Sequence, residues 1–243
     1  MLPYIVLEIR RTLRDGVFMI FGIGMPVLMY LLFTNLGGGG DGNDASGWKA
    51  FSMVGMAAYG ALGAAMSIGT GVASDKSLGW LQQLRITPLD PSRVVVGRAI
   101  SGSVTVLPTI LTVLLAGALV NGVRLEVWQW IALPLLLWIG ALPFTMLGIG
   151  NGYRLTPQAT GVVNVACLMG FAIVGGLWFP LSEYPSWLRS VGTYTPAHRF
   201  ADLGWATTGG HAPSAGTIAV LAGWLLLFGT YAVTSYRRSA RTV

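Results

Sequence analysis

Long apolar stretches separated by short polar connections dominate the chain. A helix that crosses the hydrocarbon core of a bilayer needs about 20 predominantly apolar residues. Six stretches have roughly this length and predict six transmembrane helices. They cover about 16–36, 48–73, 99–120, 127–150, 159–177 and 214–236. The pattern therefore predicts an all-α, polytopic membrane protein that forms one transmembrane domain, residues 1–243.

The first residues follow a different pattern. Residues 2–15 carry charged side chains on one helical face and apolar ones on the other. The apolar positions are Leu2, Ile5, Ile9 and Leu13. Such a helix lies in the membrane interface with its arginines toward the headgroups. We expect residues 1–15 to form an N-terminal interfacial helix that anchors the first span or contributes to gating.

Residues 178–213 contain four prolines and scattered charges, and are too polar to span a membrane. Short helical patterns follow Pro185 and Pro196, and proline is well suited to the first helical position. Tryptophan and tyrosine are frequent here, as at membrane interfaces. The segment is predicted to form two re-entrant outer helices between the fifth and sixth spans.

Prolines interrupt the apolar pattern of the first and third predicted spans. Pro26 lies in the first span and Pro108 in the third. Proline inside a helix removes a backbone hydrogen bond and bends the helix. We therefore expect a kink in each of these spans.

Residues 74–98 form a long polar interruption between the second and third spans. Ser74 or Asp75 can cap a short helix there, and Thr87 before Pro88 ends it. Its apolar stripe consists of Leu78, Leu81 and Leu84, with Trp80 beside it. A helix of this kind either fits a groove in a partner protein or lies on the lipid surface.

Composition and charge agree with a membrane protein. Charged residues make up 10% of the chain, against about 25% in soluble domains. The net charge of +6 comes from basic residues beside the ends of the apolar stretches, which argues against a nucleic-acid partner. With the N-terminus in the cytoplasm, eleven basic residues lie inside and four outside, as the positive-inside rule requires. Both termini are then cytoplasmic.

The sequence contains no recognisable energy source of its own. Every charged residue falls at an end of a span or in a loop, whereas ion-coupled transporters place titratable groups at membrane depth. The glycine-rich runs lack the lysine of a phosphate-binding loop. The two histidines, His198 and His211, are too few to predict a metal site. The chain is not expected to be an enzyme, and the energy must come from another protein.

The segment SDKSLGWLQQLRITPLDPSRVVVGRAI, residues 74–100, resembles the coupling-helix loop of type-2 ABC exporter permeases. Residues 7–33 resemble that family's amphipathic start and first span, and residues 176–200 its re-entrant segment. The loop matches at Asp75, Gly79, Leu81, Leu84, Thr87, Pro88, Leu89, Gly97 and Arg98. The family often has Glu-Arg-Glu before this helix, where the present chain has Ser-Asp-Lys at 74–76.

The resemblance implies a permease subunit of an ATP-driven exporter. Two permease chains, identical or homologous, would bind two copies of a separate ATPase that carries ATP and Mg, with no cofactor on this chain. The implied ATPase-coupling residues are Asp75, Leu78, Gly79, Trp80, Leu81, Leu84, Arg85, Thr87 and Pro88.

The branch that looks most similar is the daunorubicin-resistance type of efflux permease. It implies export of amphipathic drugs or lipid-like molecules across a bacterial plasma membrane, and antibiotic resistance. Alternatives are a permease for polysaccharide or lipid-linked export, a non-transporting membrane scaffold, and a passive lipid scramblase.

Candidate substrate-pathway residues come from the spans and the start of the outer segment. They are Met25, Met29, Met56, Asn164, Phe171 and Trp178. Methionines can form an adaptable binding surface, but they also serve as ordinary packing residues. Asn164 is the amide that lies well inside a span. Small residues of the second span permit close helix approach: Gly60, Gly63, Ala64 and Gly69.

Overall fold

The computed structural model describes residues 16, 18–35, 43–78, 98–100 and 102–241. Within these ranges the regular secondary structure is helical throughout. The elements are η1 (Phe18–Gly24), α2 (Met25–Asn35), α3 (Asn43–Ser77), α6 (Val106–Leu119), α7 (Val127–Gly140), α8 (Leu142–Arg154), α9 (Pro157–Val174), η2 (Leu181–Glu183), α10 (Ser186–Tyr194), α11 (Pro196–Thr208) and α12 (Ala215–Arg241).

Four segments of the described chain are long and apolar enough to cross a membrane. They are Ser46–Ser77, Val127–Arg154, Pro157–Val174 and Ala215–Ser239. They match the predicted second, fourth, fifth and sixth spans. The predicted first and third spans correspond to shorter apolar helices, Gly22–Asn35 and Val106–Leu119. The all-α membrane architecture is confirmed with four candidate spans, and six crossings stay a prediction.

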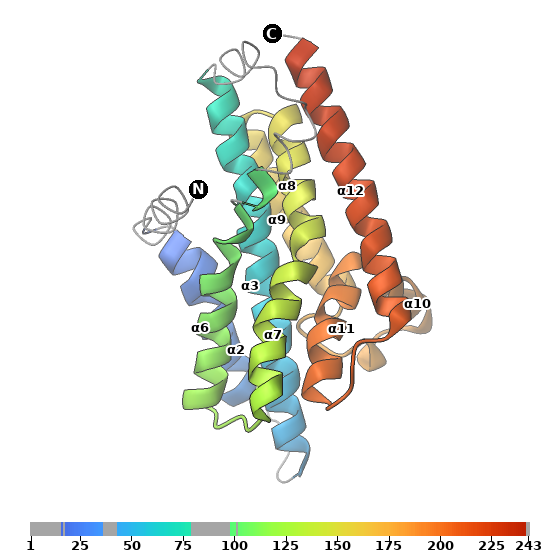
Figure 1. The fold of residues 1–243 in the computed structure, drawn as a ribbon. Helices are drawn as coiled ribbons and strands as arrows, with labels where there is room; N and C mark the ends of the chain where they lie inside the picture. Colours follow the sequence, from blue (N-terminus) through green and yellow to red (C-terminus); the bar gives the residue numbers. More distant parts are fainter. Residues whose placement is uncertain (1–15, 17, 36–42, 79–97, 101, 242–243) are drawn as a thin grey trace.

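Helix α3 lies at the centre of the bundle, packed against α2, α6, α8, α9 and α11 (Figure 1). Its apolar window is 78% buried, whereas that of α9 is only 17% buried. A helix that is apolar all round can be enclosed on every side. The main core accordingly forms around α3, with Met53, Met56 and Leu62 fully buried beside Phe144 and Phe200.

The backbones of α3 and α8 touch through glycines. A Cβ atom on Gly69 would lie 2.0 Å from the Gly148 carbonyl oxygen. A Cβ atom on Gly152 would lie 2.2 Å from the Gly69 carbonyl oxygen. Small residues let membrane helices approach this closely. The predicted packing role of Gly69 is confirmed.

The prolines coincide with irregularities in the first and third predicted spans. The π-helix η1 gives way to α2 at Met25, one residue before Pro26, so the first span is irregular there. The third span is likewise interrupted next to Pro108, as expected: residues 102 and 103 are helical, residues 104 and 105 form a turn, and α6 begins at Val106 with Pro108 in its first turn. Amide groups in a first turn have no acceptor within the helix, so a proline costs little there.

The predicted fourth span consists of two helices. Helix α7 ends at Gly140 and α8 begins at Leu142, with Pro143 in the first turn of α8. Proline removes a backbone donor, which explains the break at Ala141. The hydropathy pattern does not reveal this break, because both sides are equally apolar, and Pro143 is the residue in the sequence that marks it.

The two helices predicted between the fifth and sixth spans are present as α10 and α11. Pro196 is the first residue of α11, as predicted, whereas Pro185 precedes α10 as its cap. Helix α11 lies between α7 and α12 in Figure 1 and buries Phe200, Ala201 and Leu203 against its neighbours. It is therefore part of the packed body.

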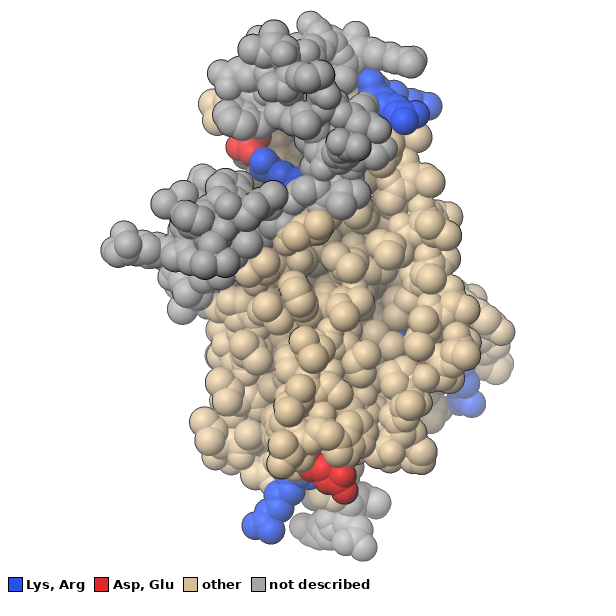
Figure 2. Space-filling model, in the orientation of Figure 1, with Lys and Arg blue, Asp and Glu red and all other residues tan. Residues whose placement is uncertain are grey.

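Charged side chains are unevenly distributed over the surface. On the face drawn in Figure 2, the described ones lie toward the upper end and the lower part, with a broad uncharged band between them. A band of this kind is what the hydrocarbon core of a bilayer requires. The surface thus agrees with the membrane assignment made from the helices.

Candidate functional site

The end of α3 carries the first residues of the 74–98 loop. Helix α3 continues through Ser77, and the following Leu78 is 83% exposed. The hydroxyls of Ser74 and Ser77 donate to carbonyls of their own helix, those of Thr70 and Ser74. Neither Ser74 nor Asp75 caps a new helix, and that prediction is wrong. Both residues lie within α3, and the Ser74 hydroxyl bonds to the preceding turn of that helix.

An ion pair joins the two ends of the loop. The Arg98 guanidinium donates to the Asp75 carboxylate, which connects the last turn of α3 to the helical residues 98–100. The two side chains are 30% and 40% exposed. Ion pairs this accessible stabilise a fold by only about 0–1 kcal/mol. The pair therefore contributes little to the stability of the fold, and its main effect is to fix the two loop ends next to each other.

Lys76 connects α3 to the end of α8. Its Nζ atom lies 3.0 Å from the carbonyl oxygens of both Tyr153 and Leu155. The last carbonyls of a helix lack partners within the helix, and a cation suits the negative end of the helix dipole. Lys76 thus fixes the C-terminus of α8 to the last turn of α3.

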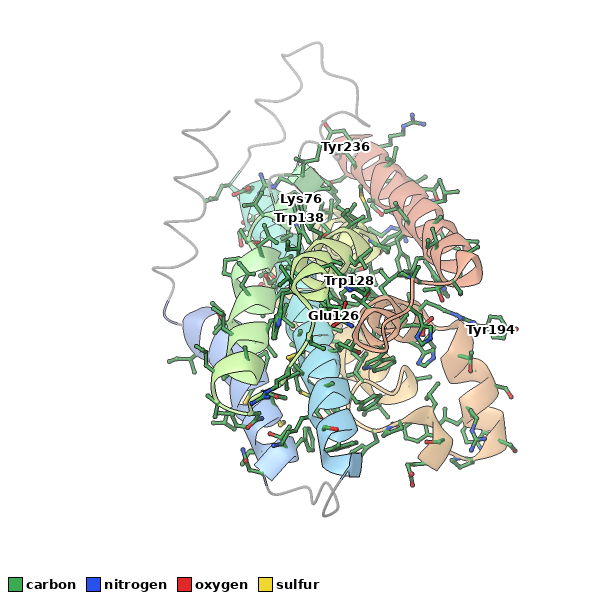
Figure 3. The ribbon with its side chains drawn as sticks, turned by 60° about the horizontal axis from the view of Figure 1, so that its bottom comes forward. Lys76, Glu126, Trp128, Trp138, Tyr194 and Tyr236 are labelled. Atoms are coloured by element: carbon green, nitrogen blue, oxygen red, sulfur yellow. The ribbon has the colours of Figure 1, made fainter. Side chains whose placement is uncertain are left out.

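An apolar cluster lies next to these polar contacts and shares Tyr153 with them. It is formed by Val72, Ala99, Ile149, Tyr153, Ala232 and Tyr236. The rings of Tyr153 and Tyr236 meet edge to face, with centroids 5.1 Å apart. We call this cluster, together with Asp75, Lys76 and Arg98, the loop base. Lys76 and Tyr236 lie toward the same end of the bundle in Figure 3.

A buried amide network ties four helices together deeper in the bundle. The Asn164 amide donates to the Met66 carbonyl at 2.7 Å, and the Asn151 amide donates to the Asn164 side-chain oxygen at 2.9 Å. The Tyr231 hydroxyl donates to the Asn151 side-chain oxygen at 2.9 Å. The network joins α3, α8, α9 and α12, and both asparagines are buried.

The sequence analysis singled out Asn164, whereas Asn151 falls just outside the predicted fourth span, 127–150. Helix α8 extends to Arg154, which puts Asn151 inside the bundle opposite Asn164. The short connection between α8 and α9 could have indicated that these two asparagines lie close together. In a tight helical hairpin, the last turns of one helix face the first turns of the next. Among the described residues, Asn35 donates to the Leu31 carbonyl of its own helix.

Replacing Asn164 with leucine should destabilise the protein. The change leaves the Asn151 amide without its Asn164 partner and removes the second hydrogen bond of the buried Met66 carbonyl, at a cost of about 1–3 kcal/mol. The folded fraction after heating in detergent, followed by size-exclusion chromatography, measures the effect. Asn35→Leu is the matched control, because Asn35 is exposed and bonds within its own turn. Equal losses in both variants would contradict a role for the network.

The three methionines of the predicted pathway occupy different environments. Met56 is fully buried in α3, Met29 is partly buried against the main core, and Met25 is exposed on α2. They do not share one surface within a single chain. Their role in a substrate pathway stays a prediction.

The aromatic pathway residues pack against other rings. Phe171 meets Phe144 edge to face at 5.7 Å, and Trp178 meets Tyr59 at 5.6 Å. The Trp178 indole nitrogen is buried and has no hydrogen-bond partner among the described residues. Asn164 belongs to the amide network. These residues stay candidates for the pathway.

The remaining predicted coupling residues lie outside the described residues. They are Gly79, Trp80, Leu81, Leu84, Arg85, Thr87 and Pro88. The interfacial helix predicted within residues 1–15 also lies outside them. In the part of the chain that the structure describes, no three His, Cys, Asp or Glu side chains lie together as possible metal ligands.

Comparison with known proteins identifies the family. Residues 5–203 match the protein family described as ABC-2 type transporter. The chain belongs to this family. The match begins before η1 and ends within α11, so it includes Asp75, Lys76 and Arg98 of the loop base and both asparagines of the amide network, but not α12. The resemblance derived from the sequence is confirmed, and the chain is an ABC-2 permease.

A relative of similar length supports the assignment. YvfS of Bacillus subtilis (strain 168), described as a candidate transport permease, is 29% identical over 225 residues. The alignment covers 92% of this chain and 91% of that protein. Membership of the ABC-2 family implies an ABC ATPase subunit as partner, and the permease chain is not itself the catalytic ATPase.

Proposed function

We propose that this ABC-2 permease exports amphipathic small molecules, drug-like or lipid-like, out across a bacterial plasma membrane. A separate ATPase drives export through the 74–98 loop. Two permease chains and two ATPase subunits form the working complex. The permease crosses the membrane six times, and both termini and the loop lie in the cytoplasm.

The loop base carries this proposal. The loop leaves α3 beside Asp75 and Lys76 and returns at Arg98. Asp75 pairs with Arg98, and Lys76 bonds to the end of α8. The apolar cluster behind them adds α12. A push on the loop is therefore delivered to three helices at once, of which α3 is the centre of the bundle.

The proposed orientation rests on where the basic residues lie. Arg154 contacts Ser235 of α12, and Lys76 contacts the end of α8, so these cations share one end of the bundle with the loop. Figure 1 places the end of α3 and the end of α12 at that same end. Basic residues concentrate on the cytoplasmic side of membrane proteins.

The proposed amphipathic substrate agrees with the apolar and aromatic character of the candidate pathway residues.

The variant Leu81→Glu tests the proposal. Leu81 belongs to the apolar stripe of the predicted coupling helix, and an unpaired carboxylate in a partner groove is costly. We expect the co-purified ATPase and the substrate-stimulated ATP hydrolysis to fall by about tenfold or more, corresponding to at least ~1.4 kcal/mol. Both are measured on the complex purified in detergent.

The matched control is Leu119→Glu. Leu119 is 80% exposed at the end of α6, so the same exchange there should leave ATPase binding unchanged. Transport that stays normal in Leu81→Glu would contradict force transfer through the loop. Dye movement in proteoliposomes without ATP would favour a scramblase instead.

A further inference from the structure

An open groove of about 450 Å³ runs between α8 and α12. Its apolar wall consists of Leu147 from α8 with Leu227 and Phe228 from α12. Thr230 and Thr234 continue along the same stripe of α12, because positions three to four residues apart share a helical face. Both helices belong to candidate spans, so the groove opens sideways from the body of the protein.

One end of the groove is polar. Tyr231 and Asn151 line it and belong to the buried amide network. The Arg154 guanidinium lies over the Tyr231 ring, 4.9 Å from its centroid, and its Nε donates to the Ser235 hydroxyl at 3.1 Å. These contacts hold the guanidinium at the end of the groove where α8 terminates.

The charge of Arg154 is not neutralised by the described part of the chain. Arg98 and Arg199 each lie within ion-pair distance of an aspartate, whereas Arg154 has no described carboxylate within that distance. Arg154 is exposed, and its remaining N–H groups suit an anionic oxygen. Guanidinium groups bind phosphate through paired, charge-assisted hydrogen bonds.

We propose that this groove binds an anionic phospholipid from the leaflet on the loop side. An acyl chain lies along Leu147, Leu227 and Phe228, and the phosphate contacts Arg154. The combination of a lateral apolar groove and an unneutralised cation at its end matches the two parts of such a lipid. The apolar window of α12 is only 22% buried within the chain, which leaves its outer side available to lipid.

The bound lipid would connect α8 to α12 beside the loop base. Tyr231 lines the groove, and Tyr236 lies farther along the same helix in the loop-base cluster. An anionic lipid is therefore expected to stiffen the end of the bundle that holds the loop. This proposal does not depend on the transported substrate or on the ATPase.

Titration of the purified permease with dioleoyl phosphatidylglycerol and with dioleoyl phosphatidylcholine, followed by native mass spectrometry, tests the site. We expect phosphatidylglycerol to bind about tenfold more tightly, because phosphatidylcholine offers Arg154 the same phosphate but its choline cation offsets the attraction, whereas phosphatidylglycerol keeps a net negative charge. Arg154→Gln should abolish this preference and Arg154→Lys should keep part of it. Arg124→Gln, in the exposed loop at the opposite end, should keep all of it.

A second variant addresses the groove without touching the charge. Thr230 is exposed, and its hydroxyl bonds to the Leu227 carbonyl of its own helix, so Thr230→Trp fills the groove while leaving the network intact. It should weaken binding of both lipids. Equal affinity for the two lipids in the unmodified protein, or unchanged binding in Thr230→Trp, would overturn the proposal. Equally tight binding of glycerol 3-phosphate would identify a free-anion site and also overturn it.

Discussion

Reversing one charge of the Asp75–Arg98 pair should abolish ATP-driven transport, and reversing both together should restore it. In Asp75→Arg two cations face each other across the loop base, and in Arg98→Asp two carboxylates do. Like charges at this distance repel and separate the two ends of the loop. The double variant reinstates attraction in the opposite sense.

Transport into inside-out vesicles and folded fraction should be measured side by side on all three variants. Because both side chains are substantially exposed, each single exchange should lower stability by only about 1 kcal/mol. Transport should fall by about tenfold or more, if loop geometry controls coupling as proposed. The double-mutant cycle isolates the pairwise interaction from effects on either residue alone. A double variant no better than the worse single variant would show that the pair does not control coupling.

Replacing Gly69 with alanine should be the most damaging small change in the described bundle. The new methyl group would lie 2.0 Å from the Gly148 carbonyl oxygen and 2.5 Å from its carbon, atoms that belong to backbone and cannot rotate away. Helices α3 and α8 must then separate. Overpacking of this kind costs about 1–3 kcal/mol, and much of the centre of the bundle depends on this contact. We expect a large loss of folded protein after mild heating.

Gly71→Ala provides the matched control two residues away. Gly71 lies in the same helix, and a Cβ atom there would meet nothing within 4 Å. Both exchanges remove a helix-interior glycine, which by itself stabilises a helix by about 0.5–1 kcal/mol. Gly71→Ala should therefore be neutral or slightly stabilising. Similar behaviour of the two variants would mean that α3 and α8 are not held together by backbone contact.

The positions of most helices follow from the sequence. Apolar length predicts α3, α9 and α12, and the prolines at 185 and 196 correctly indicate α10 and α11. These features are local, because a stretch of one helix needs only its own residues to show that it is long, apolar or interrupted. The family resemblance rests on an equally local segment and is confirmed.

Features that depend on partners distant in the sequence were not predicted. The carbonyl partners of Lys76 lie 77 and 79 residues away, and Asn164 bonds to a carbonyl 98 residues away. The ion pair of Asp75 was missed for the same reason, since its partner Arg98 lies 23 residues further on. Hydropathy gives no register between helices, so these contacts require the packed structure.

The break at Ala141 divides the predicted fourth span into two helices that pack on different neighbours. On one side of it, α8 packs mainly on α3 and α12, next to the loop base. On the other side, α7 packs mainly on α11, and the Gln129 amide donates to the Thr207 carbonyl at 2.7 Å. A tilt of α8 that begins at the loop need not tilt α7 by the same angle. The chain can bend at residues 140–142, so α8 can tilt first and α7 can follow afterwards.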